Sequence, residues 1–272
     1  MLSIIIPTLN EEKYLPSLLE EIKKQNFSDY EIIVADGGSE DKTVKIARNY
    51  GCKIVKGGLP AKGRNEGAKI AEGDILLFMD ADNIFLPENF LSKLLEEFEK
   101  RNLDVASFPI YPQGNGFDRF AYEIYNFWVN LTQKFSAYAT NSILVKKEIH
   151  QKIGGFDEEI KMAEDHSYVK RARKSGKFGF IKTEPVLTST RRFEQDGRFK
   201  TYLKYFLAGI HLFFLGDIKS DIFKYRASGG SMNICSSPAS LLRSKSSLSE
   251  GKDENEVLID HRAYVKRRRR WR

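Results

Sequence analysis

Cysteine is scarce in this sequence, and it contains no long apolar run. Two of the 272 residues are cysteines, Cys52 and Cys235, too few for a disulfide framework or a cysteine zinc site, so a reducing compartment is favoured. The longest nearly apolar run covers residues 205–215, whereas a membrane-spanning helix needs about 20 apolar residues. The sequence opens on a strand-like run and shows no basic n-region of a secretory signal. We therefore expect a cytoplasmic protein that does not cross a membrane.

Charge of one sign is also scarce over most of the chain. The net charge is +7, but residues 226–272 hold 11 Lys and Arg against 5 Asp and Glu, whereas residues 1–225 hold 33 against 32. The basic character belongs to the C-terminal segment, so residues 1–225 give no electrostatic sign of nucleic-acid binding. Hydrophobic residues make up 41% and charged residues 30% of the chain, which excludes a wholly disordered protein.

The change in composition predicts a domain boundary near residue 225, followed by a Ser- and Arg-rich tail over residues 226–272. Residues 226–232 resemble a linker followed by a second methionine start. Three interpretations of the tail remain open. It is a fused foreign peptide that has no place in the fold, a native disordered tail without a specific role, or a basic arm that contacts anionic lipid or another polyanion.

Strand-like and helix-like patterns alternate through residues 1–110. Short apolar runs predict strands at 2–7, 31–35, 53–56, 74–79 and 104–110, and the intervening periodicity predicts helices near 15–22, 41–50, 61–71 and 87–100. Pro87 suits the first turn of the last helix. Apolar strands separated by helices predict an α/β fold, a mostly parallel sheet flanked by helices, whose ligands bind beyond the carboxyl ends of the strands.

Polar clusters follow three of the predicted strands. They are residues 7–12, residues 36–39 and Asp80-Ala81-Asp82. Each cluster alone is explained by turns and helix caps. Because the carboxyl ends of parallel strands share one edge of the sheet, the joint placement of the three favours a single site.

Asp80-Ala81-Asp82 is the sharpest chemical feature. In an extended segment, residues i and i+2 project to the same side, so both carboxylates would face one divalent cation together with water and phosphate oxygens. The alternative is a solvated acidic turn. Two like charges at the end of an apolar strand are unfavourable without a cation, and the metal site is therefore preferred.

The ordered motifs resemble those of glycosyltransferase family 2, whose members are inverting, nucleotide-sugar-dependent enzymes with the GT-A fold. The resemblance covers roughly residues 1–215 and excludes the tail. It is carried by six segments, which are residues 3–11, 36–43, 63–67, 80–82, 154–157 and 163–166.

The resemblance implies a role for each matching position. It implies a nucleotide-binding part over about residues 1–110 and an acceptor part over about 111–225, and a UDP- or GDP-sugar as donor. Asp80 and Asp82 would be the Asp-x-Asp pair that holds Mg²⁺ or Mn²⁺, with Asp82 more directly on the metal, and Asp165 would be the catalytic base. The remaining positions would bind the donor: Pro7, Thr8, Asn10, Glu12 and Asp80 in the nucleotide pocket, Asp36 at the base or ribose, and Arg64 near the diphosphate.

Arg191 and Arg192 follow a strand-like run at residues 186–188. Forked guanidinium groups are suited to a leaving diphosphate, and the alternative for this pair is a basic surface turn. Polysaccharide-synthesising members of the family often carry a Gln-x-x-Arg-Trp motif in this region. This chain has Arg191-Arg192-Phe193-Glu194 instead, which argues against a processive enzyme and resembles single-transfer members.

Two aromatic-rich helical segments, near residues 117–135 and 202–215, make up the predicted acceptor side. We interpret them chiefly as core packing over the sheet, and alternatively as an amphipathic surface that seats the enzyme on the cytoplasmic face of a membrane. The family allows a soluble glycan, a lipid-linked sugar or a polyprenyl phosphate as acceptor. With a phosphate acceptor, Asp165 would position substrate rather than act as a base. His166 is interpreted as a structural neighbour of Asp165.

The sequence therefore predicts an inverting, metal-assisted glycosyltransferase of class EC 2.4, which moves a sugar from a nucleoside-diphosphate sugar to an acceptor hydroxyl or a lipid phosphate. A catalytically inactive nucleotide-sugar-binding or membrane-docking scaffold is the non-enzymatic alternative, against which the intact Asp80, Asp82 and Asp165 speak. A sugar-phosphate nucleotidylyltransferase uses a related fold, but residues 7–10 lack the glycine-rich, Arg-containing loop expected of that class.

Overall fold

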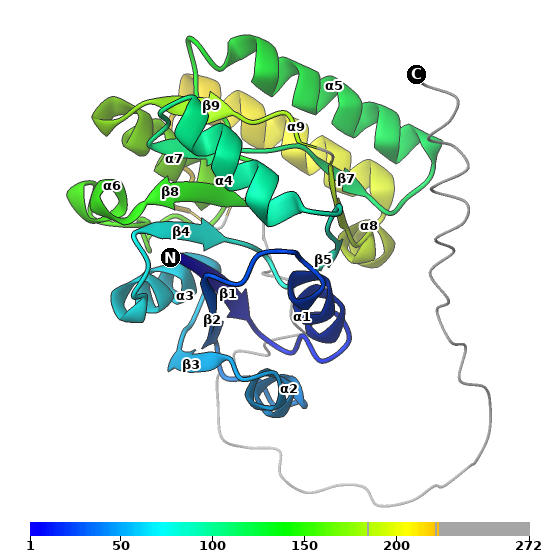
Figure 1. Ribbon diagram of the computed structural model, residues 1–272. Coiled ribbons are helices and arrows are strands. Elements are labelled where there is room, and N and C mark those ends of the chain that lie inside the picture. The colour runs from blue at the N-terminus through cyan, green and yellow to red at the C-terminus, as the bar shows by residue number, and fades with distance from the viewer. Residues whose placement is uncertain (184, 221, 223–272) are drawn as a thin grey trace, which may run out of the picture. The chain divides into compact units, whose positions relative to one another are not determined.

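The described chain folds into two β-sheets packed with helices, as Figure 1 shows for this computed structural model. The structure describes residues 1–183, 185–220 and 222, all within one compact unit. The predicted tail at 226–272 and Cys235 lie outside the described residues, and the domain boundary near residue 225 stays a prediction. None of the helices in the described ranges combines the length and the apolarity that a membrane crossing requires.

The larger sheet has seven strands in the order β3-β2-β1-β4-β8-β6-β9. Neighbouring strands are parallel except at β8, which runs antiparallel to both β4 and β6. The predicted mostly parallel sheet flanked by helices is confirmed. The strands are β1 (Leu2–Thr8), β2 (Tyr30–Asp36), β3 (Lys53–Lys56), β4 (Ile75–Phe78), β6 (Val105–Ser107), β8 (Ile143–Lys146) and β9 (Phe178–Phe180).

A second sheet of three strands lies beyond the carboxyl end of β4. Its order is β5 (Asn83–Phe85), β10 (Val186–Thr188) and β7 (Ile110–Pro112). The single strand predicted for 104–110 is wrong, because the chain divides there between β6 and β7, which belong to different sheets. Pro109 sits at the break, where a residue without a backbone N–H cannot continue the ladder.

Nine helices cover the sheets in the described ranges. The predicted helices between the first strands are confirmed with boundaries shifted by a few residues, but Pro87 is not in a first turn. The fourth helix begins at Phe90, after Asn89 in the left-handed conformation (φ 56°). The bounds are α1 (Leu15–Lys23), α2 (Thr43–Asn49), α3 (Pro60–Ile70), α4 (Phe90–Lys100), α5 (Gly116–Thr132), α6 (Lys147–Lys152), α7 (Glu164–Ser175), α8 (Arg191–Asp196) and α9 (Arg198–Phe214).

Strand β1 is apolar on both faces because both faces of the sheet are covered. Ile4 and Ile6 pack into the core under α1 and α4, whereas Ile5 packs into the opposite core with Phe78 and Tyr168. Burial of each of these side chains contributes about 1.5–3 kcal/mol. The two cores hold β1 and β4 at the centre of the sheet, and this fixes where their carboxyl ends lie.

The stripes on α5 and α9 do not pack over the sheet. The helices themselves are confirmed, but the interpretation as core packing is wrong, because Phe127 and Phe206 are each 65% exposed. The inward faces carry other side chains, such as Asn126 and Val129 on α5 and Ala208 on α9. Figure 1 shows both helices running along one side of the described unit.

His150, on α6, is buried within an aromatic cluster, away from the carboxyl end of β4 where Asp80 and Asp82 lie. Its Nδ1 lies 2.9 Å from the Tyr168 hydroxyl, and its ring lies 5.4 Å from that of Phe78. Burial, assisted by the charge of Arg171, lowers the pKa of His150 from 6.5 to about 4. The folded protein therefore holds this imidazole neutral over a range in which the unfolded chain would protonate it.

We expect the free energy of unfolding to fall as the pH drops from about 6.5 towards 4, because the unfolded state then binds a proton that folded His150 does not. In the variant His150→Gln, which keeps a polar partner for Tyr168, this part of the fall should disappear, a difference of up to about 3 kcal/mol. Urea unfolding at several pH values measures it. Parallel pH profiles for the two proteins would contradict the assignment.

Candidate functional site

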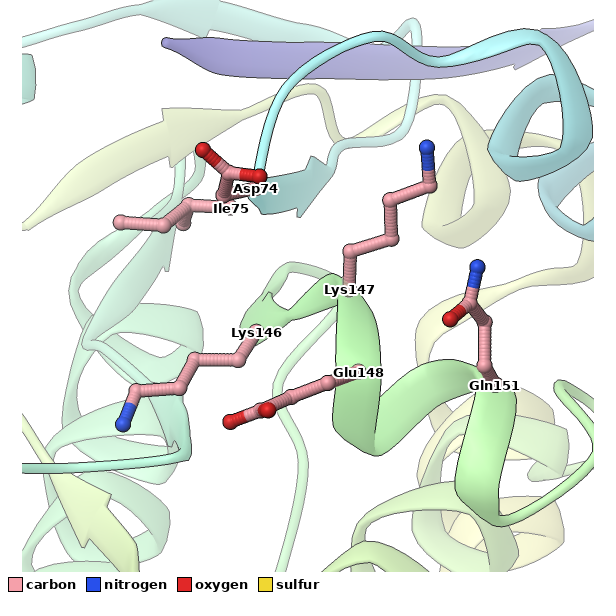
Figure 2. Close-up of a pocket in the computed structure, with 6 residues that line it drawn as sticks. All are labelled: Asp74, Ile75, Lys146, Lys147, Glu148 and Gln151. Atoms are coloured by element: carbon pink, nitrogen blue, oxygen red, sulfur yellow. The ribbon is translucent and has the colours of Figure 1, made fainter.

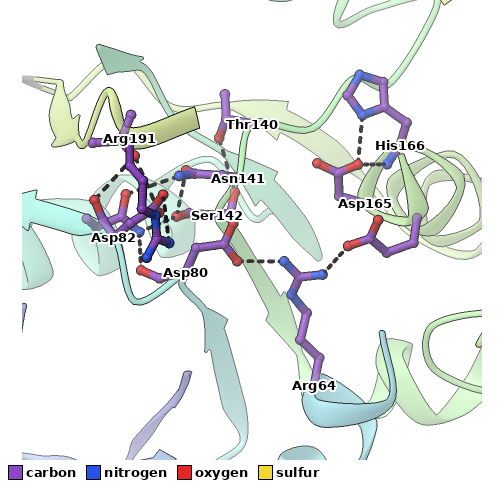
Figure 3. Close-up of polar contacts among 12 residues, drawn as sticks. Arg64, Asp80, Asp82, Thr140, Asn141, Ser142, Asp165, His166 and Arg191 are labelled. Atoms are coloured by element: carbon purple, nitrogen blue, oxygen red, sulfur yellow. Dashed lines mark hydrogen bonds and ion pairs between the residues drawn. The ribbon is translucent and has the colours of Figure 1, made fainter. Parts of the chain in front are cut away.

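Asp80 and Asp82 lie on a turn at the carboxyl end of β4 (Figure 3). The amide of Asn83 donates to the Asp80 carbonyl at 2.8 Å, and the backbone of Ser189 donates to the Asp82 carbonyl at 2.9 Å. The segment is a turn rather than the extended strand end assumed from the sequence. The two side chains therefore diverge, Asp80 towards Arg64 and Asp82 towards Arg191.

Arg64, on α3, bridges two carboxylates from distant parts of the chain. Its Nη2 donates to Asp80 Oδ1 at 2.7 Å and its Nη1 to Glu164 Oε1 at 2.6 Å, while the guanidinium lies over the Phe156 ring at 5.2 Å. The side chain is 4% exposed. Burial alone would lower the pKa of Arg64, but the charges of Asp80 and Glu164 outweigh it and raise that pKa. The arginine stays charged and orients both acids.

Glycine at two positions allows α3 to approach the sheet closely enough for this bridge. A methyl group at position 67 would lie 2.4 Å from Ile5 Cγ2, and one at position 63 would lie 3.1 Å from Pro7 Cβ. Both glycines are on the face of α3 that packs on β1. Larger residues there would push the helix outward and withdraw Arg64 from the strand end.

On the other side of the turn, Arg191 at the start of α8 forms a bidentate ion pair with Glu11. Its Nη1 and Nη2 lie 2.8 and 2.9 Å from the two Glu11 carboxylate oxygens, and Nη2 lies 3.9 Å from Asp82 Oδ2. The guanidinium also stacks over Tyr14, at 4.6 Å from the ring centre. The Nε of Arg191 is buried and has no hydrogen-bond partner. Arg191 thus places positive charge beside Asp82 and keeps one donor unused.

Glu11 lies in the polar cluster after β1, but no local pattern in the sequence marks it for a particular role. The pKa of Glu11 is raised to about 7, chiefly by burial; Arg191 lowers it, and the charges of Asp82 and Asp80 add to the rise. Burial likewise raises the pKa of Asp80 to about 6, with Arg64 opposing and Asp82 adding to the shift. Acids accumulate at this strand end beyond what the two arginines neutralise, an arrangement that would suit a bound cation.

The predicted nucleotide-pocket residues lie in two loops at the same edge of the sheet. Asp36, at the end of β2, accepts hydrogen bonds from the Thr8 hydroxyl (3.1 Å), the Ser39 hydroxyl (2.5 Å) and the backbone of Gly38 and Ser39 (2.9 Å each). Its carboxylate is thus committed largely to shaping the loop after β2. The assignment of Asp36 to the base or ribose stays a prediction, as does that of Pro7, which lies in β1 beside Ala35.

The loop after β1 is fastened to the loop after β2. Asn10 has a left-handed backbone (φ 54°), and its side chain accepts from the backbone of Glu40 at 2.8 Å. The Glu12 side chain accepts from the backbone of Lys42 at 3.1 Å. The structure therefore gathers Asn10 and Glu12 next to the Asp36 loop, and it uses their side chains to join the two loops.

Asp165 lies in the first turn of α7, next to Glu164. Its Oδ1 accepts from the backbone of His166 at 2.8 Å and lies 3.0 Å from His166 Nδ1. Burial alone would raise the pKa of Asp165, but His166 and Arg64 outweigh it and hold that pKa below the ordinary value. An ionised, partly exposed carboxylate is a suitable proton acceptor. His166 is confirmed as a direct neighbour of Asp165, and its Nε2 lies 3.3 Å from the Tyr125 hydroxyl.

Arg191 and Arg192 are adjacent in the sequence, but their side chains point to different parts of the structure. Arg192 points away from Arg191, towards α9, and donates to the Tyr205 hydroxyl at 3.0 Å.

Asn141, which no motif in the sequence marks, also lies at the site. It donates to the Asn83 side chain at 3.2 Å and accepts from Ser142 at 3.2 Å (Figure 3). The Asn141 loop carries no periodic pattern or motif that would have marked it, because the contact depends on the tertiary fold.

The donor atoms at the turn fit a divalent cation that is shared with a ligand. Two carboxylates supply hard oxygen atoms, and each is partly exposed, 31% for Asp80 and 17% for Asp82. Among the described residues there is no group of three or more His, Cys, Asp or Glu side chains that could hold a metal by itself. A cation here would need oxygen atoms from water and from a bound phosphate group.

A separate depression of about 340 Å³ opens at the amino end of β4 (Figure 2). It is lined by Asp74, Ile75, Glu148 and Gln151 together with Lys146 and Lys147. The two lysines are engaged in the structure, Lys146 with Asp104 at 2.7 Å and Lys147 with the carbonyl of Ala71 at 2.5 Å. The depression lies at the opposite end of β4 from Asp80 and Asp82, and its polar groups join sheet to helix.

Comparison with known proteins identifies a family. Residues 3–156 match the model of glycosyl transferase family 2. A protein named uncharacterized glycosyltransferase from Haemophilus influenzae is 30% identical over 203 residues, which cover 69% of this chain and 67% of that protein. The glycosyltransferase EpsJ of Bacillus subtilis is 28% identical, with 62% and 54% covered. The poly(ribitol-phosphate) β-N-acetylglucosaminyltransferase TarS of Staphylococcus aureus is 38% identical over 91 residues, only 16% of its length.

Solved structures show the same fold at low sequence identity. TarS residues 1–349 in complex with UDP-GlcNAc superpose with a TM-score of 0.56 and 22% identity, over 70% of this chain and 58% of that one. The mannosyltransferase PcManGT from Pyrobaculum calidifontis, in complex with GDP-Man and Mn²⁺, gives a TM-score of 0.61 and 18% identity, over 77% and 64%.

We expect Arg64→Met to lower the free energy of unfolding by about 3–5 kcal/mol, because it leaves the carboxylates of Asp80 and Glu164 without their shared cation. Arg64→Lys should recover part of the loss, since it keeps the charge but not the fork. Arg48→Met, at an exposed position on α2, is the control and should change stability by less than about 0.5 kcal/mol. Urea unfolding measures all three. Equal stability of the Arg64→Met and Arg48→Met variants would contradict the bridge.

Proposed function

The chain belongs to glycosyltransferase family 2 and has the GT-A fold, and from this premise we propose that it transfers a sugar from a nucleoside-diphosphate sugar, with inversion and with the help of a divalent cation. The observation that carries the proposal is one strand-end site with two charge centres. Asp82 lies beside Arg191 on one side, and on the other side Asp80 is joined through Arg64 to Glu164, the neighbour of the ionised Asp165.

The donor would bind across the loops after β1, β2 and β4. Thr8, Asn10, Glu12 and Asp36 line the edge where the nucleoside would lie, and Asp80 and Asp82 face the diphosphate. Asp82 and Asp80 would hold Mg²⁺ or Mn²⁺, which when bound would neutralise the diphosphate. Relatives support this choice of donor and cation, because TarS was solved with UDP-GlcNAc and PcManGT with GDP-Man and Mn²⁺.

Arg191, Arg192 and Arg64 would contribute to different degrees to stabilising the negative charge of the diphosphate. Arg191 would stabilise the leaving diphosphate by its charge beside Asp82 and by releasing part of its fork from Glu11. Arg192, which contacts Tyr205, is a weaker candidate for the diphosphate. Arg64 is already committed to two carboxylates, so we assign it to positioning Asp80 and Glu164 near the diphosphate rather than to a direct contact.

With a hydroxyl acceptor, the transfer would be a single displacement. The acceptor oxygen attacks the anomeric carbon and its proton passes to Asp165, while the bond from that carbon to the diphosphate oxygen breaks and the nucleoside diphosphate leaves with the electron pair. His166 would hold the Asp165 carboxylate in orientation. With a lipid phosphate as acceptor no proton needs to be removed, and Asp165 would orient that acceptor instead.

We propose that the reaction takes place in the cytoplasm or at the cytoplasmic face of a membrane. The small number of cysteines supports a reducing compartment, and the exposed aromatic faces of α5 and α9 support contact with a membrane surface. The acceptor would be a glycan hydroxyl or a polyprenyl phosphate presented at that surface.

A panel of UDP-, GDP-, dTDP- and CMP-sugars, each with and without Mn²⁺, tests donor binding by thermal stabilisation. One nucleotide class at about 100 times its dissociation constant should add about 2.7 kcal/mol, and only with the metal. Asp82→Asn should abolish the metal-dependent part. The control Asp74→Asn, at the other end of β4, should respond like the parent. An unchanged response of Asp82→Asn would refute the metal assignment.

Asp165→Asn should keep donor binding and lower kcat for transfer to a hydroxyl acceptor by about 10²- to 10⁴-fold, because the amide cannot take the proton. Product formation from a labelled donor, followed over pH, measures the effect. Asp157→Asn, a surface acid paired with Lys219, is the control and should transfer normally. Normal turnover by Asp165→Asn would rule out its role as base.

A further inference from the structure

The outward faces of α5 and α9 expose an unusual amount of apolar surface. We call these two stripes together the apolar helix face. On α5 the exposed fractions lie between 52% and 65%, and the side chains are Phe117, Phe120, Ile124, Phe127, Trp128 and Leu131. On α9 they lie between 40% and 79%, and the side chains are Phe199, Leu203, Phe206, Leu207, Ile210 and Phe214. Exposed apolar patches of this extent mark contact surfaces for another molecule or a membrane.

The two stripes are held in a fixed relation at their N-terminal ends. The fully buried carboxylate of Asp118 on α5 accepts from Arg198 Nε at 3.1 Å and from the Tyr202 hydroxyl at 3.0 Å, both on α9. The rings of Phe117 and Tyr202 meet edge to face at 5.6 Å. Both helices run along the same side of the unit in Figure 1, and these contacts join them near their N-terminal ends.

The charge on α9 indicates the chemistry of the partner. This helix contains Arg198, Lys200 and Lys204 and no acidic residue, although Arg198 also pairs with the buried Asp118 and Lys204 lies 3.7 Å from Asp196. A helix with aromatic and aliphatic residues on one face and cations on its flank is the type that lies in the headgroup region of an anionic bilayer.

The inward sides of the same helices contact the acceptor side of the site. The Tyr125 hydroxyl on α5 donates to the carbonyl of Ala139 at 2.5 Å and lies 3.3 Å from His166, the neighbour of Asp165. On α9, Tyr205 accepts from Arg192. A surface that rests on the apolar helix face would therefore lie directly behind the groups proposed to receive the acceptor.

We propose that the apolar helix face docks on an anionic lipid bilayer and that the acceptor therefore carries a lipid tail. The aromatic and aliphatic side chains enter the headgroup boundary, and Arg198, Lys200 and Lys204 contact lipid phosphates. The lipid tail of the acceptor stays in the bilayer while its polar head reaches Asp165. The docking follows from the surface alone, whereas the nature of the acceptor rests on the proposed glycosyl transfer.

The full chain is tested for cosedimentation with vesicles of phosphatidylcholine and phosphatidylglycerol in equal parts, and with vesicles of phosphatidylcholine alone. We expect binding to the anionic vesicles and weaker binding to the neutral ones. The double variant Phe127→Ser/Phe206→Ser should bind the anionic vesicles at least about tenfold less tightly. The matched control Leu59→Ser/Ile70→Ser removes exposed apolar side chains outside the face and should bind like the parent.

Three results would overturn the docking proposal. The first is a parent protein that stays in the supernatant. The second is equal binding by the parent and the Phe127→Ser/Phe206→Ser variant. The third is a parent protein that forms a dimer and binds no vesicles, while the variant is a monomer. Light scattering after size exclusion reports the last. Thermal stabilisation by donor and Mn²⁺ is measured in parallel, and it should be the same in parent and variant. Loss of that response in the parent would count against the proposed function, not against the docking.

Discussion

The buried ion pairs of Arg64 hold the candidate site together. One guanidinium, 4% exposed, joins a carboxylate at the end of the central strand to a carboxylate at the start of a helix that follows 100 residues later. In a low-dielectric setting each of these charges would be costly alone, so the three groups must stay together or not be buried at all. Gly63 and Gly67 permit the close approach of α3 to β1, and this approach keeps the three groups together. The carboxyl end of β4 and the start of α7 are thereby fixed to one another.

The positions of the polar clusters were predictable, because the end of an apolar run in the sequence marks the end of a strand. The clusters after β1, β2 and β4 stand at one edge of the sheet as expected, and Asp165 lies beside His166. The pairing of Glu11 with Arg191 was not predictable, because residues 180 positions apart leave no local pattern. The division of residues 104–110 between two sheets follows from Pro109, which lacks the backbone N–H that a continuous ladder needs. Roles of individual side chains in binding remain predictions.

The apolar helix face shows a limit of periodicity as a guide. Spacing along α5 identified which residues share a face, and the helix forms as predicted. Periodicity does not say what covers that face, because the same amphipathic pattern serves a protein core and a membrane surface. Inward positions such as Asn126 and Asp118 settle the question here, since their polar side chains find buried partners while Phe127 points outward.

The distance along the chain between Glu11 and Arg191 also bears on how the protein is made. These two residues meet across 180 positions, so the Glu11 carboxylate has no arginine to pair with until most of the described chain has been synthesised. Contacts of such long sequence separation close late, because loop closure has to be completed before they contribute. A chain emerging from the ribosome can therefore form β1, β2 and β4 early yet leave Glu11 unpaired. The part of the site that depends on this ion pair is therefore completed late in folding.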